Sequence, residues 1–310
     1  MQHHHNLIGG EWVPSASGAC YAIHNPARPE ECLGEFADST EADVKAAVDA
    51  AASEAPAWAG IPAPHRGAIL FRFSQLLEES KNELARIVTL EQGKALGEAV
   101  GEVGRAAAEA RFMAAEASRP AGHTFPSERP GSSCYTVAEP LGVIAAICPW
   151  NFPVVAPVRK IAPALAWGNT VVFKPSSLTP WSAVYLMERL VQAGVPPGVI
   201  NLVTGQGSVV GEALIHDARV PGISFTGSTS VGMHIYEAAA RRLSKVQLEL
   251  GGKNPAVVMD YEDLDNAARE IVAAAFLCSG QRRPEFPTGV GHTQDLVECF
   301  VEITAPLPVK

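Results

Sequence analysis

The sequence has little charge, no long apolar run and no paired cysteines, and each shortage excludes a class of protein. Charged residues make up 18% of the 310 residues, and 33 acidic residues against 24 basic ones give a formal net charge of −9. An acidic chain with dispersed basic residues lacks the positive surface that nucleic acids and anionic membranes bind. We therefore expect no nucleic-acid partner and no membrane partner.

A membrane span and a disulfide framework are also excluded. No apolar run reaches the roughly 18 residues of a spanning helix, and the longest candidate, Ile271 to Cys278, is far too short. The N-terminus has no basic region followed by an apolar stretch, so it does not resemble a secretory signal. The cysteines lack CxxC spacing, which favours reduced thiols in a cytoplasmic protein. They are Cys20, Cys32, Cys134, Cys148, Cys278 and Cys299.

Three adjacent histidines, His3 to His5, stand near the N-terminus. Such a run could bind a metal ion, but a short terminal run is more often disordered or an added tag. We therefore assign no metal site from the sequence.

Helical spacing dominates the first 119 residues after a strand or hairpin predicted around Leu7 to Val13. Thr40 can cap a helix whose apolar residues recur every three or four positions. Further helices are predicted over Ile69 to Leu77, Leu84 to Leu90 and Ala95 to Ala117. Between Pro120 and Pro140 the composition shifts to Gly, Ser, Pro and Thr, which predicts an extended arm or linker.

From Leu141 short apolar runs alternate with helical segments. A continuous apolar run is typical of a buried parallel strand, and this alternation predicts a parallel sheet with helices on both faces. The predicted strands are Val143 to Cys148, Thr170 to Lys174, Val199 to Thr204, Gly222 to Thr226 and Val246 to Leu250. The clearest helices between them are Ser182 to Ala193 and Val231 to Arg241. The fold class is therefore α/β, with a Rossmann-like sheet.

Ligands of such sheets bind at the carboxyl ends of the strands, and two glycine-rich turns are predicted there. Gly205-Gln206-Gly207 follows a strand, but its spacing is not GxGxxG, so the usual dinucleotide fingerprint is absent. Gly227 and Ser228 come at a helix N-terminus, where backbone N–H groups and the helix dipole favour a phosphate. A capped helix after a tight turn explains these two residues equally well. Gly207, Gly227 and Ser228 are thus candidate cofactor-binding residues.

Lys174 ends a predicted buried strand, where a charge is unfavourable without a partner or ligand. A ribose hydroxyl or a phosphate would serve as that ligand. The alternative is a lysine whose ammonium reaches solvent at the strand end.

Four motifs resemble the aldehyde dehydrogenase superfamily in sequence, order and spacing. They are Pro149-Trp150-Asn151-Phe152-Pro153, Lys174-Pro175-Ser176, Phe225-Thr226-Gly227-Ser228-Thr229 and Leu248-Glu249-Leu250-Gly251-Gly252-Lys253. The resemblance runs from about Leu7 to Gln281, which is nearly the whole chain. It implies that NAD or NADP is the cofactor and that a small aldehyde is the substrate.

The resemblance also implies roles for single residues. In that family a cysteine thiolate attacks the aldehyde, hydride passes to the nicotinamide, and water releases the acid from a thioester. Asn151 would donate its amide to the oxyanion, and Glu249 would be the general base for the water. Lys174 would hold the adenosine ribose, with Trp150 and Ser228 against the pyrophosphate. Without the family, Asn151 would be a turn residue and Glu249 an ion-paired glutamate.

Two positions bear on specificity. Many NAD-preferring members carry a glutamate three residues after the motif lysine, where it binds both ribose hydroxyls and repels a 2′-phosphate. Ser177 stands there, which predicts that NADP is tolerated. Arg159 resembles the arginine with which succinate-semialdehyde dehydrogenases hold the substrate carboxylate, and guanidinium pairs well with carboxylate. It favours succinic or 2-oxoglutaric semialdehyde, while a surface arginine beside Lys160 is the alternative.

The chain departs from the family pattern after Gln281. The family loop reads Phe-x-x-x-Gly-Gln-x-Cys, and here Arg283 stands in place of the cysteine. Arginine has no nucleophilic sulfur, so we expect that the chain forms no thioester and is inactive. Cys278 is expected to be an inert buried thiol. The match is lost from Arg283 and returns loosely at Leu296 to Ile303, which favours a reading-frame slip.

These patterns predict an NAD(P)-binding domain in residues 1–119 and 141–250, and an oligomerisation-type arm in 120–140. Residues 251–310 would be the truncated start of a catalytic domain, with a non-family tail from 283. The family's C-terminal strand, which pairs with the arm, has no counterpart here, and this argues against the family's homo-oligomer. Two functions remain: aldehyde oxidation that needs the missing cysteine, and a non-enzymatic NAD(P)-binding remnant or partner of a full-length paralogue.

Overall fold

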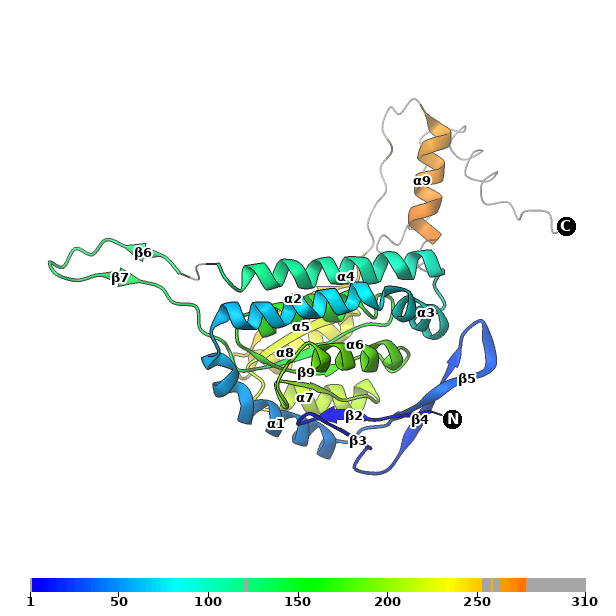
Figure 1. Cartoon of the computed structure of the whole chain (residues 1–310), viewed down its shortest axis with the longest axis horizontal. Helices are drawn as coiled ribbons and strands as arrows, with labels where there is room; N and C mark the ends of the chain where they lie inside the picture. The colour runs from blue at the N-terminus through cyan, green and yellow to red at the C-terminus, as the bar shows by residue number, and fades with distance from the viewer. Residues whose placement is uncertain (1, 120–121, 253–257, 259–262, 277–310) are drawn as a thin grey trace. The chain divides into compact units, whose positions relative to one another are not determined.

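The structure is a computed structural model that describes residues 2–119, 122–252, 258 and 263–276 (Figure 1). The chain divides into two compact units, Met1–Glu249 and Leu250–Lys310, and each is described by itself. In the second unit, helix α9 spans Leu264–Phe276. The predictions for Cys278, for Arg283 and for the helix from Leu296 lie outside the described residues.

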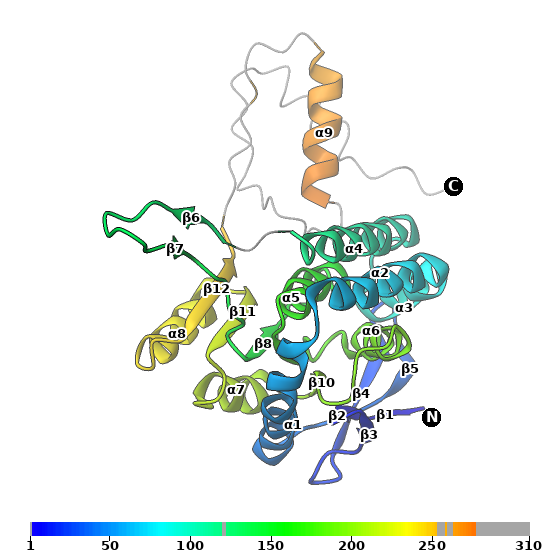
Figure 2. The same ribbon diagram turned by 60° about the vertical axis from the view of Figure 1, so that its left-hand side comes forward.

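A seven-stranded sheet runs through the first unit (Figure 2), in the order β12-β11-β8-β9-β10-β2-β3. Its strands are β2 (Asn6–Ile8), β3 (Glu11–Val13), β8 (Val143–Ile147), β9 (Thr170–Lys174), β10 (Ile200–Leu202), β11 (Gly222–Gly227) and β12 (Lys245–Leu250). The neighbours β10, β9, β8 and β11 are parallel. With β8 as strand 1, the order is 3-2-1-4-5, which is that of a doubly wound Rossmann sheet. The predicted fold class is confirmed.

One edge of this sheet is the hairpin that was predicted around Leu7 to Val13; its antiparallel pairing with the parallel strands was not predicted. Strand β2 pairs antiparallel with β10, and β3 with β2. The turn between β2 and β3 uses Gly9 and Gly10, with φ of 62° and 90°, as a tight hairpin of this kind requires. The hairpin pairs the edge of the parallel sheet, whose N–H and C=O groups would otherwise be open to other chains.

Helices cover both faces of the sheet (Figure 2). They are α1 (Glu41–Gly60), α2 (Ala63–Glu79), α3 (Lys81–Gln92), α4 (Leu96–Glu116), α5 (Val155–Ala166), α6 (Pro180–Gln192), α7 (Glu212–His216) and α8 (Thr229–Ala240). Helix α1 begins after Thr40 as predicted, and the Asp43 carboxylate accepts the Thr40 N–H at 2.8 Å. The large side chains of Trp58, Phe73 and Phe173 are each at most 1% exposed and fill the core between helices and sheet.

A second, three-stranded sheet was not predicted. Its order is β1 (His3–His4), β5 (Arg28–Ala37) and β4 (Cys20–Asn25), with β1 parallel and β4 antiparallel to β5. The expectation of a disordered terminal histidine run is therefore wrong. His4 is buried, and its ring stacks on Phe36 with centroids 4.6 Å apart.

The segment predicted as an arm is extended. It holds the two-stranded antiparallel sheet of β6 (Thr124–Phe125) and β7 (Cys134–Tyr135), whose residues are exposed. Its role in oligomer formation stays a prediction. Over the residues that the structure describes, no helix combines the length and apolar character that crossing a bilayer demands.

Candidate functional site at the carboxyl ends of the strands

The parallel strands bring most of the predicted site residues to one edge of the sheet. Strand register places Ile147 of β8 level with Lys174 of β9 and with Phe225 of β11. The predicted residues that follow these strands or β10 are Trp150, Asn151, Ser177, Gly207 and Ser228. The strand order reverses between β8 and β11, and doubly wound sheets bind their ligands beside such a reversal.

Lys174 is the last residue of β9 and is only 5% exposed. Its ammonium donates one hydrogen bond, to the Pro175 carbonyl at 2.9 Å. Burial lowers the pKa of Lys174 to about 8, because desolvation disfavours the charged form. A lysine has three N–H groups, and within the described part of the chain no other acceptor bonds to this ammonium. The solvent-reaching alternative does not hold, and two donors are left for a ligand.

Ser228 caps helix α8, and its hydroxyl accepts the N–H of Val231 at 3.4 Å. The structure thus contains the helix cap that was the alternative interpretation of this turn. Phosphate binding at the turn stays a prediction. Gly227 ends β11, and a Cβ placed on it would lie 2.4 Å from the Phe225 ring. A side chain at Gly227 would therefore force the strand end or the ring to move.

The other glycine turn depends on a different residue than expected. Gly207 begins the π-helical turn Gly207–Gly211, and a Cβ on it would meet nothing within 4 Å. Gly205 instead has φ of 130°, and a Cβ on it would lie 2.9 Å from the Ser39 nitrogen. Because that backbone conformation disfavours any other residue, Gly205 is the glycine that this turn requires.

Asn151 lies in the loop between β8 and α5, and a buried ion pair holds that loop. The Lys94 ammonium lies 2.6 Å from a Glu102 carboxylate oxygen, with side chains 0% and 1% exposed. The same ammonium donates to the main-chain carbonyl of Asn151 at 2.7 Å. It also lies 4.4 Å from the centroid of the Phe152 ring. Lys94 thus binds the peptide that carries the predicted oxyanion amide.

The second oxygen of Glu102 caps helix α5. It accepts the N–H groups of Val154 and Val155 at 2.8 and 3.1 Å. A helix leaves its first N–H groups without partners, and its dipole favours a negative charge there. Lys94 and Glu102 therefore hold the Asn151 peptide and the end of its loop that enters α5. We did not predict these two residues from the sequence, because Lys94 precedes Asn151 by 57 positions and each resembles an ordinary surface charge.

Glu249 is the penultimate residue of β12 and is exposed. It accepts a hydrogen bond from Gln247 at 3.2 Å. Lys160 of α5, which is 5% exposed, donates to Ser224 at 3.1 Å and to Gln247 at 3.5 Å. Burial lowers the pKa of Lys160, and the charges of Cys148 and Glu249 oppose that change. Glu249 therefore lies in the field of an ammonium, and its role as a base stays a prediction.

Arg159 lies on the exposed side of α5. Its guanidinium donates twice to one oxygen of Glu109 on α4, at 3.0 and 2.7 Å. This is the surface pairing that the sequence left as the alternative, with the side chain 46% exposed. Such exposed pairs contribute about 0–1 kcal/mol, so Arg159 can exchange Glu109 for another carboxylate at little energetic cost.

Trp150 and Ser177 are both half-buried at the same edge of the sheet. Trp150 follows β8 directly, and Ser177 lies in the turn between β9 and α6. No carboxylate stands at position 177, so the turn itself carries no charge that would oppose a phosphate.

Comparisons with known proteins agree with this geometry. The sequence profile of the aldehyde dehydrogenase family matches residues 12–283. Alpha-ketoglutaric semialdehyde dehydrogenase of Bacillus subtilis is 43% identical over 277 residues, which cover 89% of this chain and 57% of that protein. The NADP(+) succinate-semialdehyde dehydrogenase of Escherichia coli is 42% identical over 275 residues, with 89% and 57% covered.

A solved structure agrees over more of the chain. That of an NADP-dependent enzyme of Escherichia coli matches with a TM-score of 0.91 and 39% identity, and it covers 97% of this chain and 63% of that one. This chain thus spans less than two thirds of the length of the relatives that it matches. The chain belongs to the aldehyde dehydrogenase family.

Proposed function

We propose that this chain binds a nicotinamide dinucleotide, NAD or NADP, at the carboxyl ends of β8, β9 and β11. One observation carries the proposal: the buried Lys174 ammonium has donors to spare at the ligand-binding edge of a Rossmann sheet. Ribose hydroxyls and phosphate oxygens are acceptors for such donors. A buried cation without enough acceptors is unfavourable, so a ligand here stabilises the folded chain.

The surrounding residues fit the same dinucleotide. Gly227 and Ser228 open α8, whose N-terminus favours a pyrophosphate, and Trp150 would lie against it. The uncharged Ser177 would admit a 2′-phosphate, which a carboxylate at that place would repel. Both Escherichia coli relatives are described by name as NADP proteins, which supports tolerance of NADP.

The family's reaction is the oxidation of an aldehyde, and a bound nicotinamide accepts the hydride. In this chain the Asn151 amide would donate to the oxyanion, and Glu249 would take a proton from the attacking water. Lys94 and Glu102 would keep Asn151 in place. The nucleophile would be missing, because Arg283 stands at its position. We therefore expect coenzyme binding without NAD(P)H formation. NAD(P)H formation with a semialdehyde would contradict the role given to residue 283.

The experiment that tests coenzyme binding is calorimetric titration of the chain with NAD and with NADP. Lys174→Met should weaken binding at least about tenfold, since hydrogen bonds to charged groups contribute about 1.5–3 kcal/mol. Lys45→Met is the control, because Lys45 is exposed and pairs with its helix neighbour Asp49. If neither coenzyme binds, or if Lys174→Met binds like the wild type, the proposal is wrong. Binding of NAD with exclusion of NADP would contradict the inference from Ser177.

The substrate class that we propose for the site is a carboxylate-bearing semialdehyde held by Arg159. Succinic semialdehyde should bind the coenzyme-loaded chain more tightly than butanal, and Arg159→Met should remove that preference. Arg105→Met is a matched control, because Arg105 also lies near Glu109, at 3.8 Å, and is exposed. Equal affinity of Arg159→Met and wild type for the semialdehyde would rule out this role.

A cytoplasmic location is the remaining part of the proposal. It is supported by the four cysteines of the described segments, none of which forms a disulfide: Cys20, Cys32, Cys134 and Cys148. Thiols that stay reduced are typical of that compartment. The proposed partners are small molecules, an aldehyde and the coenzyme, and neither a nucleic acid nor a membrane.

A further inference from the structure

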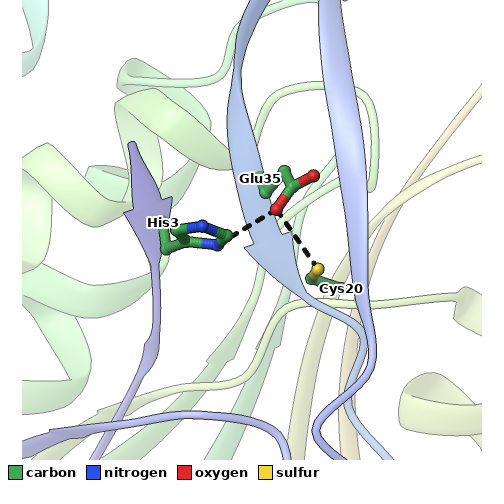
Figure 3. A group of neighbouring side chains, drawn as sticks. All are labelled: His3, Cys20 and Glu35. Atoms are coloured by element: carbon green, nitrogen blue, oxygen red, sulfur yellow. Dashed lines mark hydrogen bonds and ion pairs between the residues drawn. The ribbon is translucent and has the colours of Figure 1, made fainter. Parts of the chain in front are cut away.

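Three potential metal ligands meet on the β1-β5-β4 sheet, outside the candidate coenzyme site (Figure 3). The Nδ1 atom of His3 lies 3.0 Å from Oε2 of Glu35. The Sγ atom of Cys20 lies 3.5 Å from the same oxygen. The three ligand atoms all lie within 4.8 Å of one another. The group thus offers one nitrogen, one sulfur and one oxygen to a common point.

Strand pairing explains why these side chains meet. His3 is the direct neighbour of Glu35 in the parallel pair of β1 and β5. In the antiparallel pair of β4 and β5, Ala22 is opposite Glu35 and Cys20 is opposite Ala37. Side chains alternate between the two faces of a strand, so Cys20 and Glu35 are diagonal neighbours on one face. Three different strands therefore supply the three ligands.

The opposite face fixes the position of β1. His4 points into the protein and stacks on Phe36, with the two rings within 10° of parallel. The Glu35 N–H donates to the Gln2 carbonyl at 3.0 Å, which holds the strand in register. Because the backbone under His3 and Glu35 is already ordered, a ligand would not have to order it. Such preorganisation favours binding.

We propose that His3, Cys20 and Glu35 bind a divalent cation of the zinc class. Bonds of roughly 2.0–2.3 Å in a tetrahedral zinc site put ligand atoms about 3.3–3.8 Å apart. The two separations from Glu35, 3.0 and 3.5 Å, are close to that, and the ligand atoms of His3 and Cys20 lie within 4.8 Å of each other. Thiolate and imidazole select zinc-like ions over Mg²⁺ and Ca²⁺, which take oxygen ligands. Three protein ligands leave the fourth position to a water molecule.

Binding exchanges a proton for the cation, with no change of oxidation state. The Cys20 S–H bond breaks, its proton goes to solvent, and a sulfur–metal bond forms. The His3–Glu35 contact and the Cys20–Glu35 hydrogen bond are replaced by bonds to the ion. A neutral imidazole, a thiolate and a carboxylate together carry two negative charges, which balance a divalent cation.

The test is a Zn²⁺ titration of the full chain, freed of metal with a chelator, in competition with a chromophoric chelator. One equivalent should bind. Cys20→Ser and Glu35→Gln should each weaken that site at least about tenfold, since changes even in the outer shell of a metal site cost 10- to 100-fold. Cys134→Ser is the matched control, because Cys134 is also exposed but belongs to the β6-β7 hairpin. Its affinity should equal that of the wild type.

Cobalt supplies a second measurement that reports on the sulfur ligand. Co²⁺ added to the wild type and to Cys134→Ser should give a sulfur-to-metal charge-transfer band, and Cys20→Ser should lack it. Binding by the terminal histidines alone would survive Cys20→Ser with unchanged affinity and would overturn the proposal. The absence of a stoichiometric Zn²⁺ site would also overturn it. Circular dichroism of each variant shows whether it is folded.

Discussion

Two buried glutamates accept hydrogen bonds from the first turns of successive helices, but among the described residues only the first of them is paired with a cation. Glu102 accepts two N–H groups at the start of α5, and Lys94 lies 2.6 Å away. Glu91 accepts the N–H groups of Trp181 and Ser182 at the start of α6, at 2.8 and 3.0 Å. Across the described residues no cation pairs with Glu91, and burial raises its pKa to about 7.

The difference matches what precedes each helix. The loop before α5 carries Asn151, and its main-chain carbonyl accepts from the same Lys94 that pairs with Glu102. A buried pair adds little net stability but is strongly destabilising when one partner is removed. Here the pair positions the loop, because the Lys94 ammonium contacts both the Asn151 carbonyl and the Glu102 carboxylate that caps α5. At α6 the Glu91 carboxylate caps the helix without a cation from the described residues, and it can take up a proton near neutral pH.

The largest expected effect comes from removing Lys94, the cation that pairs with Glu102. Lys94→Met leaves the Glu102 carboxylate buried without a paired cation, which should lower the free energy of unfolding by about 3–5 kcal/mol. Urea denaturation measures it. Lys45→Met, which breaks an exposed pair, should cost at most about 1 kcal/mol. The double variant Lys94→Met/Glu102→Gln should recover part of the loss. Equal effects of the two single lysine variants would show that the buried pair is not special.

The next effect concerns the glutamate without a cation. The folded pKa of Glu91 is raised from 4.5 to about 7, so the folded state holds this proton more tightly than the unfolded state does. Its contribution is fully favourable below pH 4.5 and is lost as the pH rises through 7. At about 1.4 kcal/mol per pKa unit, the loss is about 3 kcal/mol.

Glu91→Gln should remove this dependence. The unfolding free energy of the wild type minus that of Glu91→Gln should therefore fall by about 3 kcal/mol between pH 4 and pH 8. Denaturant unfolding at several pH values measures it. If the difference in unfolding free energy grows as the pH rises, the Glu91 carboxylate is stabilised as an anion. Glu91 would then resemble Glu102, which is paired with Lys94.

Smaller effects test how rigidly α4 supports Glu102. A Cβ on Gly67 of α2 would lie 2.6 Å from the Ala114 carbonyl of α4, so Gly67→Ala should cost about 1–3 kcal/mol. A Cβ on the exposed Gly101 would meet nothing within 4 Å, so Gly101→Ala should stabilise the helix by about 0.5–1 kcal/mol. Thermal unfolding compares the two. Equal shifts would mean that the α2–α4 contact is loose enough to absorb a methyl group.

The sequence predicted features that depend on local pattern. The strands β8 to β11 were found because buried strands are rich in apolar residues, and α1 because Thr40 can cap it. Strand β12 was also found, although its residues are exposed or half-buried. Lys174 was singled out because a charge at the end of such a strand needs a ligand. The position of the glycine turn was predicted, although Gly205 and not Gly207 proved to be the residue that the backbone requires.

Features that depend on distant contacts could not be predicted. Glu91 caps α6 by accepting the N–H of Trp181, which lies 90 positions later, and neither residue differs locally from a surface glutamate or an ordinary tryptophan. The order of β1 depends on the stacking of His4 against Phe36. Register between strands then decides that Cys20 meets Glu35, and no spacing in the sequence encodes that register.

The central claim, that a nicotinamide coenzyme binds at Lys174, is tested most directly by the pKa of that ammonium. An NMR titration of the lysine side chains, with the signal assigned through Lys174→Met, should give a pKa of about 8 in the free protein. Saturating NADP should raise it, because hydrogen bonds from the charged form favour that form. A pKa near the ordinary 10.5 that does not change when NAD or NADP is added would contradict the claim.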